Sequence, residues 1–273
     1  MIIARSIHEY QQACAGWTDV AFVPTMGALH EGHMTLIREA RAHRHVVVSL
    51  FVNPIQFAAH EDLSKYPRQE QNDIAQCAAA KVDAIFVPDA TEMTERMRTR
   101  VSVSGVSELW EGTSRPGHFD GVATIVNKLF QIVRPRHAYF GQKDYQQCAV
   151  IGQMVADLNM PVELEFVPTV REKSGLALSS RNQYLTHEQR EDAAQLYATL
   201  VRTRQELLRG DEPVSRVLEA GIASLTIFGF QVEYLALVDG STLEPLNSPT
   251  ESSRLIVAAK FHSVRLIDNI ALS

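Results

Sequence analysis

Residues 24–33 read Pro24-Thr25-Met26-Gly27-Ala28-Leu29-His30-Glu31-Gly32-His33. The preceding residues 20–23 are apolar and partly β-branched, and residues 34–44 repeat apolar side chains at helical spacing. This order predicts a buried strand, then a tight loop, then the beginning of a helix. Gly27 and Gly32 allow the backbone to turn sharply and to approach a ligand closely.

A loop of this kind suits a phosphate group. The first N–H groups of a helix lack internal partners, and the helix dipole places partial positive charge at the same end. His30 and His33 are spaced so that both rings can point toward that phosphate. We therefore interpret the segment as a nucleotide-triphosphate site. A zinc site is one alternative, but the metalloprotease pattern needs His-Glu-x-x-His and no third ligand is evident nearby. Purely structural histidines are the other alternative.

Further apolar segments predict a parallel sheet. They lie at residues 46–52, 82–87, 138–140 and 162–167, separated by helical patterns that include 70–81 and 122–133. Nearly continuous apolar residues are typical of a strand that is buried on both faces. The alternation of strands and helices therefore predicts an α/β fold, a Rossmann-like doubly wound parallel sheet. Residues 112–121 are rich in Gly, Pro and Ser and predict a loop.

Polar side chains follow two of these strands. Gln56 comes just after strand 46–52, where ligands of open α/β sheets bind, although a solvated loop residue is the alternative. Gly141 opens a second glycine turn, in which Lys143 can neutralise a phosphate. Asp144 can accept from a ribose hydroxyl, hold a metal or cap a helix. Gln147 is expected one turn further on, facing the same crevice.

A third phosphate-binding element is predicted at residues 175–182. Ser179, Ser180 and Arg181 place two hydroxyls and a guanidinium in a row, which together can bind a polyphosphate. A serine-rich turn without a ligand is the alternative.

The pattern changes after this element. Thr186 and Gln189 match a capping box that begins a helix to Arg209, and a second helix is expected at 214–225. Strands are predicted at 232–238, 255–259 and 264–267, without the strand–helix alternation of the first part. We therefore predict two domains, residues 1–175 and a smaller C-terminal α+β domain at 176–273.

Composition restricts the functional class. The chain has 273 residues, 45% of them hydrophobic and 21% charged, with a formal net charge of −6. The negative charge argues against nonspecific binding of nucleic acid. The three cysteines are scattered and are expected to be reduced, and the beginning of the chain lacks signal-peptide features, so a cytoplasmic protein is expected. The longest apolar segment, 46–52, is too short to cross a membrane.

Taken together, these motifs resemble the pantoate–β-alanine ligase (pantothenate synthetase) family, within the nucleotidylyltransferases that carry His-x-Gly-His. The resemblance covers essentially the whole chain and rests on residues 24–27, His30-x-Gly-His33, 51–57, 115–119, 141–147, 178–182 and 265–269. It implies that pantoate and ATP form pantoyl adenylate and pyrophosphate, after which β-alanine gives pantothenate and AMP. Two alternatives remain: another nucleotidylyltransferase with a different small substrate, and a nucleotide-binding regulator without turnover.

The resemblance also implies roles for individual residues. The catalytic residues would be His33, as proton donor, with His30, Lys143 and Arg181. ATP would be bound by Met26, Gly27, Ala28, Leu29, His30, Glu31, Gly32, His33, Gly141, Gln142, Lys143, Asp144, Val170, Leu178, Ser179, Ser180 and Arg181. Gln56 and Gln147 would bind pantoate, and Gln56 would also bind β-alanine. The resemblance further implies Mg²⁺ with unidentified ligands, a homodimer, and a lid formed by residues 183–273.

Overall fold

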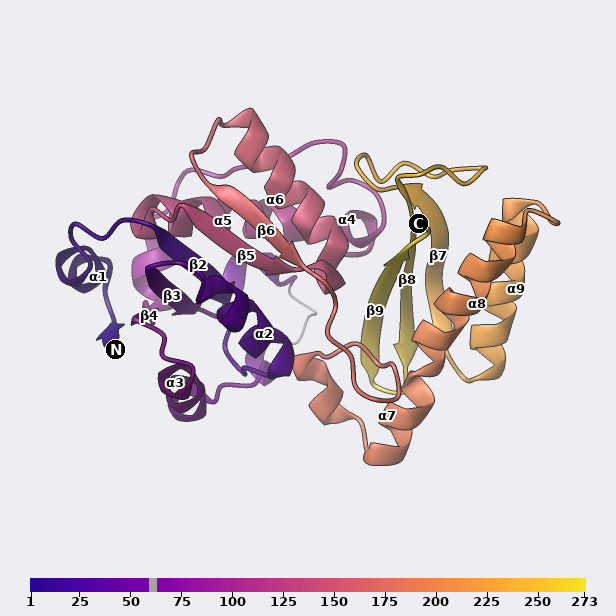
Figure 1. Cartoon of the computed structure of the whole chain (residues 1–273), viewed down its shortest axis with the longest axis horizontal. Helices are drawn as coiled ribbons and strands as arrows, with labels where there is room; N and C mark the ends of the chain where they lie inside the picture. Colours follow the sequence, from indigo (N-terminus) through magenta and orange to yellow (C-terminus); the bar gives the residue numbers. More distant parts are fainter. Residues whose placement is uncertain (59–62) are drawn as a thin grey trace. The chain divides into compact units, whose positions relative to one another are not determined.

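The computed structural model describes residues 1–58 and 63–273, and the chain forms two compact units (Figure 1). The first unit comprises Met1–Gln142 and Gln147–Pro168. The second comprises Thr169–Ser273 together with the short segment Lys143–Gln146.

The first unit contains a six-stranded sheet with the order β1-β4-β3-β2-β5-β6, and all its strand pairs are parallel. The strands are β1 (Ile2–Ala4), β2 (Val20–Thr25), β3 (His45–Leu50), β4 (Ala84–Phe86), β5 (His137–Gly141) and β6 (Glu163–Val167). The predicted parallel sheet is therefore confirmed. Sequence reasoning missed β1, which has only three residues and so carries almost no pattern.

Helices cover both faces of this sheet (Figure 1). They are α1 (Ile7–Ala13), α2 (Glu31–Ala40), α3 (Glu70–Ala79), α4 (Glu111–Ser114), α5 (His118–Val133) and α6 (Tyr145–Asp157). Val23 and Val48 pack on one face in a core that includes Ile37 of α2 and Cys77 of α3. On the opposite face, Phe22 contacts Phe130 of α5. Because neighbouring strand residues point to opposite faces, Phe22 packs against one helical layer and Val23 against the other.

The prediction of a loop at 112–121 is wrong in part. Helix α4 ends at Ser114 and α5 already begins at His118, after Gly117, whose φ is 79°. Gly121 lies inside α5, where an added Cβ would lie 2.4 Å from the carbonyl oxygen of Ile55. This glycine thus permits the helix to approach a neighbouring turn, and the sequence-based interpretation mistook a packing requirement for a loop signal.

The second unit pairs three strands with three helices, which confirms the predicted α+β composition. Strands β7 (Gln231–Asp239), β8 (Ser253–Phe261) and β9 (Val264–Ala271) form an antiparallel sheet in that order. The helices are α7 (His187–Ala193), α8 (Gln195–Arg209) and α9 (Val214–Ile227). The capping box of Thr186 and Gln189 is present. The single helix predicted to Arg209 is interrupted at Ala194, which is buried. Because alanine favours helices, local sequence gives no signal for this break.

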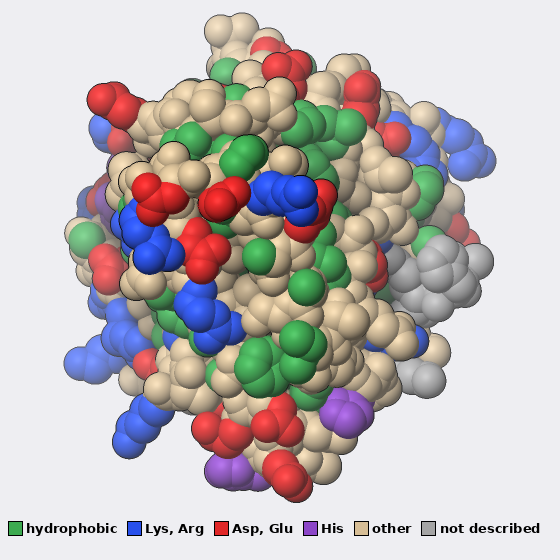
Figure 2. All heavy atoms as spheres, turned by 90° about the vertical axis from the view of Figure 1, so that its right-hand side faces the viewer, with side chains coloured by type: hydrophobic (Ala, Val, Ile, Leu, Met, Phe, Trp, Pro, Cys, Tyr) green, Lys and Arg blue, Asp and Glu red, His purple; other side chains and the backbone are tan. Residues whose placement is uncertain are grey.

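Charged side chains of both signs are interspersed on the face shown in Figure 2. Hydrophobic side chains appear there in small groups between them. In the described ranges 1–58 and 63–273, no helix combines the length and the apolar character needed to cross a bilayer.

Candidate nucleotide-binding site

The segment at residues 24–33 forms the strand, loop and helix that its pattern predicts. Strand β2 ends at Thr25 and α2 begins at Glu31. Gly27 and Ala28 both have left-handed backbones, with φ of 80° and 51°. The Thr25 hydroxyl accepts from the Gly27 N–H at 3.2 Å and donates to the Ser49 carbonyl at 2.7 Å. The loop is therefore fixed to β3 at its beginning.

A buried carboxylate from α3 fixes the middle of the loop. Asp73 accepts from the N–H groups of Ala28 and Leu29 at 2.9 and 2.8 Å and is only 1% exposed. A Cβ at Gly27 would lie 3.0 Å from the same carboxylate, so glycine leaves room for it. Burial raises the pKa of Asp73, while the two backbone N–H groups act in the opposite direction. Gln76, one turn on, donates to the Leu29 carbonyl at 3.3 Å.

The two histidines cap the beginning of α2. His30 is the N-cap residue, and its Nδ1 accepts from the Gly32 N–H at 3.1 Å. Nδ1 of His33 accepts from the His30 N–H at 3.3 Å. The two ring centroids lie 4.1 Å apart. A ring whose Nδ1 accepts a hydrogen bond carries its proton on Nε2, so both imidazoles have an Nε2–H able to donate to an anion.

The sheet order places this loop at a point where ligands bind in such folds. Strand β2 pairs with β3 on one side and with β5 on the other. The chain thus proceeds from β2 toward one edge and from β5 toward the other. At such a reversal of strand order, the carboxyl ends of the two strands flank a crevice. Thr25 and Gly141 are those ends, as the sequence analysis expects.

Gln56 lies beside the loop and its amide orientation is fixed. Its Oε1 accepts from Asn53 at 2.9 Å, so its Nε2 is directed to Met26, whose sulfur is 3.3 Å away. The ring of His118 bonds the Gln56 carbonyl at 2.9 Å. Asn53 also donates to the Gly121 carbonyl at 3.1 Å. The structure therefore brings together Met26 and Gln56, which come from two separately predicted elements.

In the second unit, the segment 143–146 is held by the three-stranded sheet. Asn269 of β9 donates to the Lys143 carbonyl at 3.0 Å, and the Tyr145 hydroxyl donates to the Gly240 carbonyl at 2.7 Å. The Lys143 ammonium lies 3.4 Å from the Asp144 carboxylate. The hydrogen bonds of this segment therefore fix the backbone from which Lys143 and Asp144 extend.

The serine-rich segment is also in the second unit. Ser179 caps a short 3₁₀ helix, Ser180–Tyr184, by accepting from the Arg181 N–H at 3.3 Å. Upstream, the Leu178 N–H donates to the Val170 carbonyl at 2.9 Å, which pairs two of the predicted ATP-binding residues. Between them Arg171 binds buried Asp268 with two bonds of 2.6 and 2.9 Å.

Comparison with known proteins identifies the family. The family model described as pantoate-beta-alanine ligase matches residues 2–271. The chain belongs to the pantoate–β-alanine ligase family. The resemblance drawn from the sequence is therefore confirmed.

Relatives in this family match the chain over its full length. Pantothenate synthetase of Acidiphilium cryptum is 47% identical over an alignment of 279 residues, which covers 100% of this chain and 100% of that protein. The crystal structure of pantothenate synthetase from Thermus thermophilus has a TM-score of 0.95 at 47% identity, covering 100% of this chain and 99% of that one. Pantoate-beta-alanine ligase from Francisella tularensis, complexed with beta-gamma ATP and β-alanine, has a TM-score of 0.82 at 35% identity, covering 100% and 98%.

The remaining predicted residues are placed by the same elements of the ligase fold. Gln147 lies half-buried in α6, and Gln142 donates to the Phe166 carbonyl of β6 at 3.4 Å. Glu31 is exposed and pairs with Arg38 at 2.5 Å, which joins the first turn of α2 to its last. Within residues 1–58 and 63–273, no group of three potential metal ligands includes His30 or His33.

Sequence reasoning missed three residues that order the candidate site: Asn53, Asp73 and His118. Asp73 could have been noticed, because it shares a buried face of its helix with Cys77, four residues on. A carboxylate is unexpected on such a face. Asn53 and His118 gave no comparable signal, since each was counted as part of a turn or a loop. Their partners lie 68 and 62 residues away in sequence, at Gly121 and Gln56 respectively.

Proposed function

We propose that the ligation proceeds in two steps through an enzyme-bound pantoyl adenylate. As a member of its family, the chain is an ATP-dependent ligase that condenses pantoate with β-alanine. In the first step a pantoate carboxylate oxygen bonds to the α-phosphorus, and the bond from that phosphorus to the bridging oxygen breaks. Pyrophosphate leaves with the electron pair. In the second step the β-alanine amine attacks the acyl carbon, AMP leaves, and the amine loses a proton.

The histidine pair is the observation that carries this proposal. With both Nδ1 atoms accepting from the backbone, His30 and His33 offer Nε2–H donors at the N-terminus of α2, where an anion is favoured. Donors fixed in advance stabilise charge that grows on a phosphate in the transition state. We assign His33, for which the resemblance implies the proton-donor role, as the residue whose Nε2–H hydrogen-bonds to the departing pyrophosphate, and His30 as a second phosphate ligand. Both rings need no reorientation for this, because the backbone already holds them.

Further residues complete the ATP site in this proposal. Met26, Gly27, Ala28, Leu29, Glu31, Gly32, Gly141 and Gln142 surround ATP in the first unit. In the second unit, Lys143 and Arg181 neutralise phosphate charge, assisted by Asp144, Val170, Leu178, Ser179 and Ser180. Phosphoryl chemistry needs positioning and charge stabilisation more than covalent help, and these groups supply both.

Gln56 and Gln147 are proposed to bind pantoate, and Gln56 also β-alanine. Neutral amides can bind hydroxyl and carboxylate groups without acting as competing nucleophiles. The fixed amide of Gln56 supports this role, because Asn53 occupies its oxygen and directs its donor group toward Met26.

The oxygen ligands of the proposed ATP site suit Mg²⁺. It prefers oxygen ligands and in nucleotide sites is held by phosphates, waters and one or two carboxylates. Asp144, with a 48% exposed side chain on the proposed ATP-binding segment, would supply such a carboxylate. When bound, Mg²⁺ would offset phosphate charge. We further propose that the enzyme is a cytoplasmic homodimer.

Product analysis tests the function against its alternatives. Incubation with ATP, pantoate and β-alanine is expected to yield AMP, pyrophosphate and pantothenate. Without β-alanine, pyrophosphate release should still depend on pantoate, as the adenylate step requires. Release supported by a different small alcohol instead of pantoate would indicate another nucleotidylyltransferase. ATP binding without AMP formation would indicate a regulator.

A further inference from the structure

Asp19, His43 and His137 form a cluster at the end of the strands opposite to the proposed ATP site. Asp19 immediately precedes β2, His43 lies two residues before β3, and His137 begins β5. They therefore lie at the amino ends of three neighbouring parallel strands, whereas Thr25 and Gly141 lie at carboxyl ends. The cluster is thus separate from the ligation chemistry.

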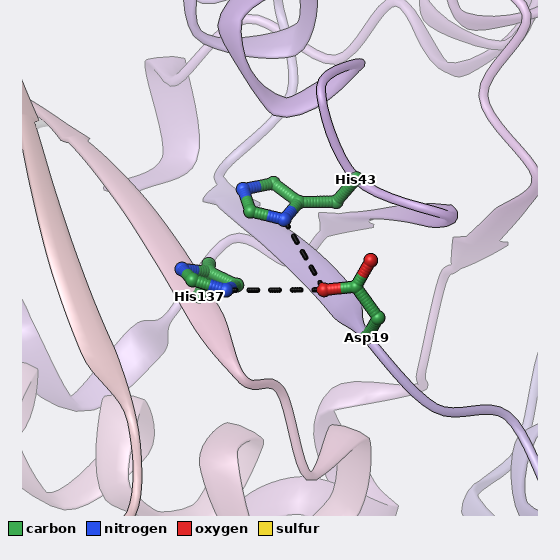
Figure 3. Close-up of side chains that lie close together, drawn as sticks. All are labelled: Asp19, His43 and His137. Carbon is green, nitrogen blue, oxygen red and sulfur yellow. Dashed lines mark hydrogen bonds and ion pairs between the residues drawn. The ribbon is translucent and has the colours of Figure 1, made fainter.

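Both imidazole rings lie beside the Asp19 carboxylate (Figure 3). Oδ1 of Asp19 lies 3.2 Å from Nδ1 of His43 and 3.8 Å from Nε2 of His137. All three ligand atoms fall within 4.8 Å of one another. Metal–ligand bonds of about 2.0–2.1 Å in a tetrahedron place ligand atoms about 3.3 Å apart. The two distances to Asp19, 3.2 and 3.8 Å, are close to that requirement.

Each side chain is also supported at its outer atom. Oδ2 of Asp19 accepts from the Arg44 N–H at 3.0 Å. Nε2 of His43 bonds the Tyr139 hydroxyl at 2.9 Å. Nδ1 of His137 is buried without a hydrogen-bond partner, and the Glu163 carboxylate lies 3.6 Å from it. In metal sites the outer nitrogen of a ligating histidine usually faces such an oxygen, which fixes the tautomer and orients the ring.

The local charge favours a cation. Asp19 and Glu163 place two carboxylates beside the imidazoles of His43 and His137. Arg136 approaches Glu163 only to 3.8 Å, and both side chains are more than half exposed. A divalent ion would therefore reduce the repulsion between these two carboxylates.

We propose that Asp19, His43 and His137 bind a divalent transition-metal ion of the zinc type. Two imidazole nitrogens and one carboxylate oxygen suit Zn²⁺, Co²⁺ or Ni²⁺ and disfavour Mg²⁺, which prefers oxygen ligands. Three protein ligands leave at least one position for water. The two rings are now stacked, with centroids 3.8 Å apart and planes inclined by 24°. Metal binding turns them apart, so that their lone pairs converge on the ion.

Cobalt titration of the full-length protein, without Mg²⁺ or ATP, tests this site. We expect one equivalent of Co²⁺ to produce visible d–d absorption that Zn²⁺ abolishes. His43→Gln should weaken binding by at least about a hundredfold, and Tyr139→Phe, which removes only the outer hydrogen bond, by about tenfold. His8→Gln changes an exposed histidine of α1 and serves as the matched control, with affinity unchanged.

The outcomes separate clearly. Absence of the Co²⁺ spectrum in the wild type, or equal affinity in His43→Gln, would overturn the proposal. If His43→Gln fails to fold, the milder Tyr139→Phe variant still decides it, because an unchanged affinity there contradicts the assigned ligand geometry. Since no ligation substrate is present, the result is independent of the proposed reaction mechanism.

Discussion

Replacing Asp73 by Asn is expected to reduce kcat/KM for ATP about 10- to 150-fold while the protein remains folded. In the native loop, one carboxylate accepts from two backbone N–H groups, at Ala28 and Leu29. Asn retains one acceptor oxygen, but its amide N–H₂ faces the other N–H, so one bond is lost. A hydrogen bond to a charged acceptor contributes about 1.5–3 kcal/mol. This loss falls on the loop that presents His30 and His33.

Steady-state kinetics with varied ATP, together with thermal unfolding, measures the effect. The free energy of unfolding should fall by less than the hydrogen-bond energy lost in the loop. Asn also removes a buried carboxylate, whose pKa is raised because burial disfavours its charged form. Glu70→Gln, at an exposed position of the same helix, is the control and should leave kcat/KM within about twofold of wild type. A folded Asp73→Asn enzyme with unchanged kcat/KM would refute the idea that this carboxylate positions the loop.

Three further predictions concern other parts of the chain. His33→Ala should keep the circular dichroism spectrum and lower turnover about a hundredfold, as for other lost transition-state donors; near-normal turnover would remove His33 from the mechanism. Arg171→Ala leaves Asp268, with its 2% exposed side chain, without its ion-pair partner and should lower the free energy of unfolding in urea by about 3–5 kcal/mol. The more exposed ion pair between Arg265 and Glu233 should contribute only about 1 kcal/mol to the free energy of unfolding. Equal losses on removing Arg171 and Arg265 would contradict this reasoning. The Ser252 hydroxyl, with backbone N–H groups, lowers the pKa of Asp239, so its stabilisation is present above the usual carboxyl pKa and is lost as pH falls through the lowered value. The stability difference between wild type and Asp239→Asn should therefore shrink below about pH 4 and would be constant if the assignment is wrong.

Local pattern was sufficient for most of the fold. The strands β2 and β3 were predictable because buried parallel strands are nearly continuous in apolar residues, as at 20–23 and 46–52. The loop at 24–33 was predictable because glycines and a following helix occur together. The adjacency of β2 and β5 agrees with the rule that such folds reverse their strand order at the ligand site.

What local pattern could not predict depends on distant partners. The role of Asp73 requires the loop 45 residues upstream, and Gly121 is conspicuous only once Ile55 lies against it. The segment Lys143–Gln146 packs with strands more than 90 residues later, through Gly240 and Asn269. The local spacing of residues cannot predict such contacts, because they depend on the tertiary fold.

The capping arrangement of His30 and His33 has a consequence for ionic strength and acidity. Their donors come from uncharged rings, so this part of phosphate recognition involves no ion pair and should respond weakly to added salt, unlike a lysine contact. Acidification acts differently. A proton added at Nδ1 takes away the acceptor that the Gly32 or His30 N–H uses, so the first turn of α2 loses its cap as the ring becomes cationic. Protonation of either ring at Nδ1 therefore removes one of the two histidine caps from α2.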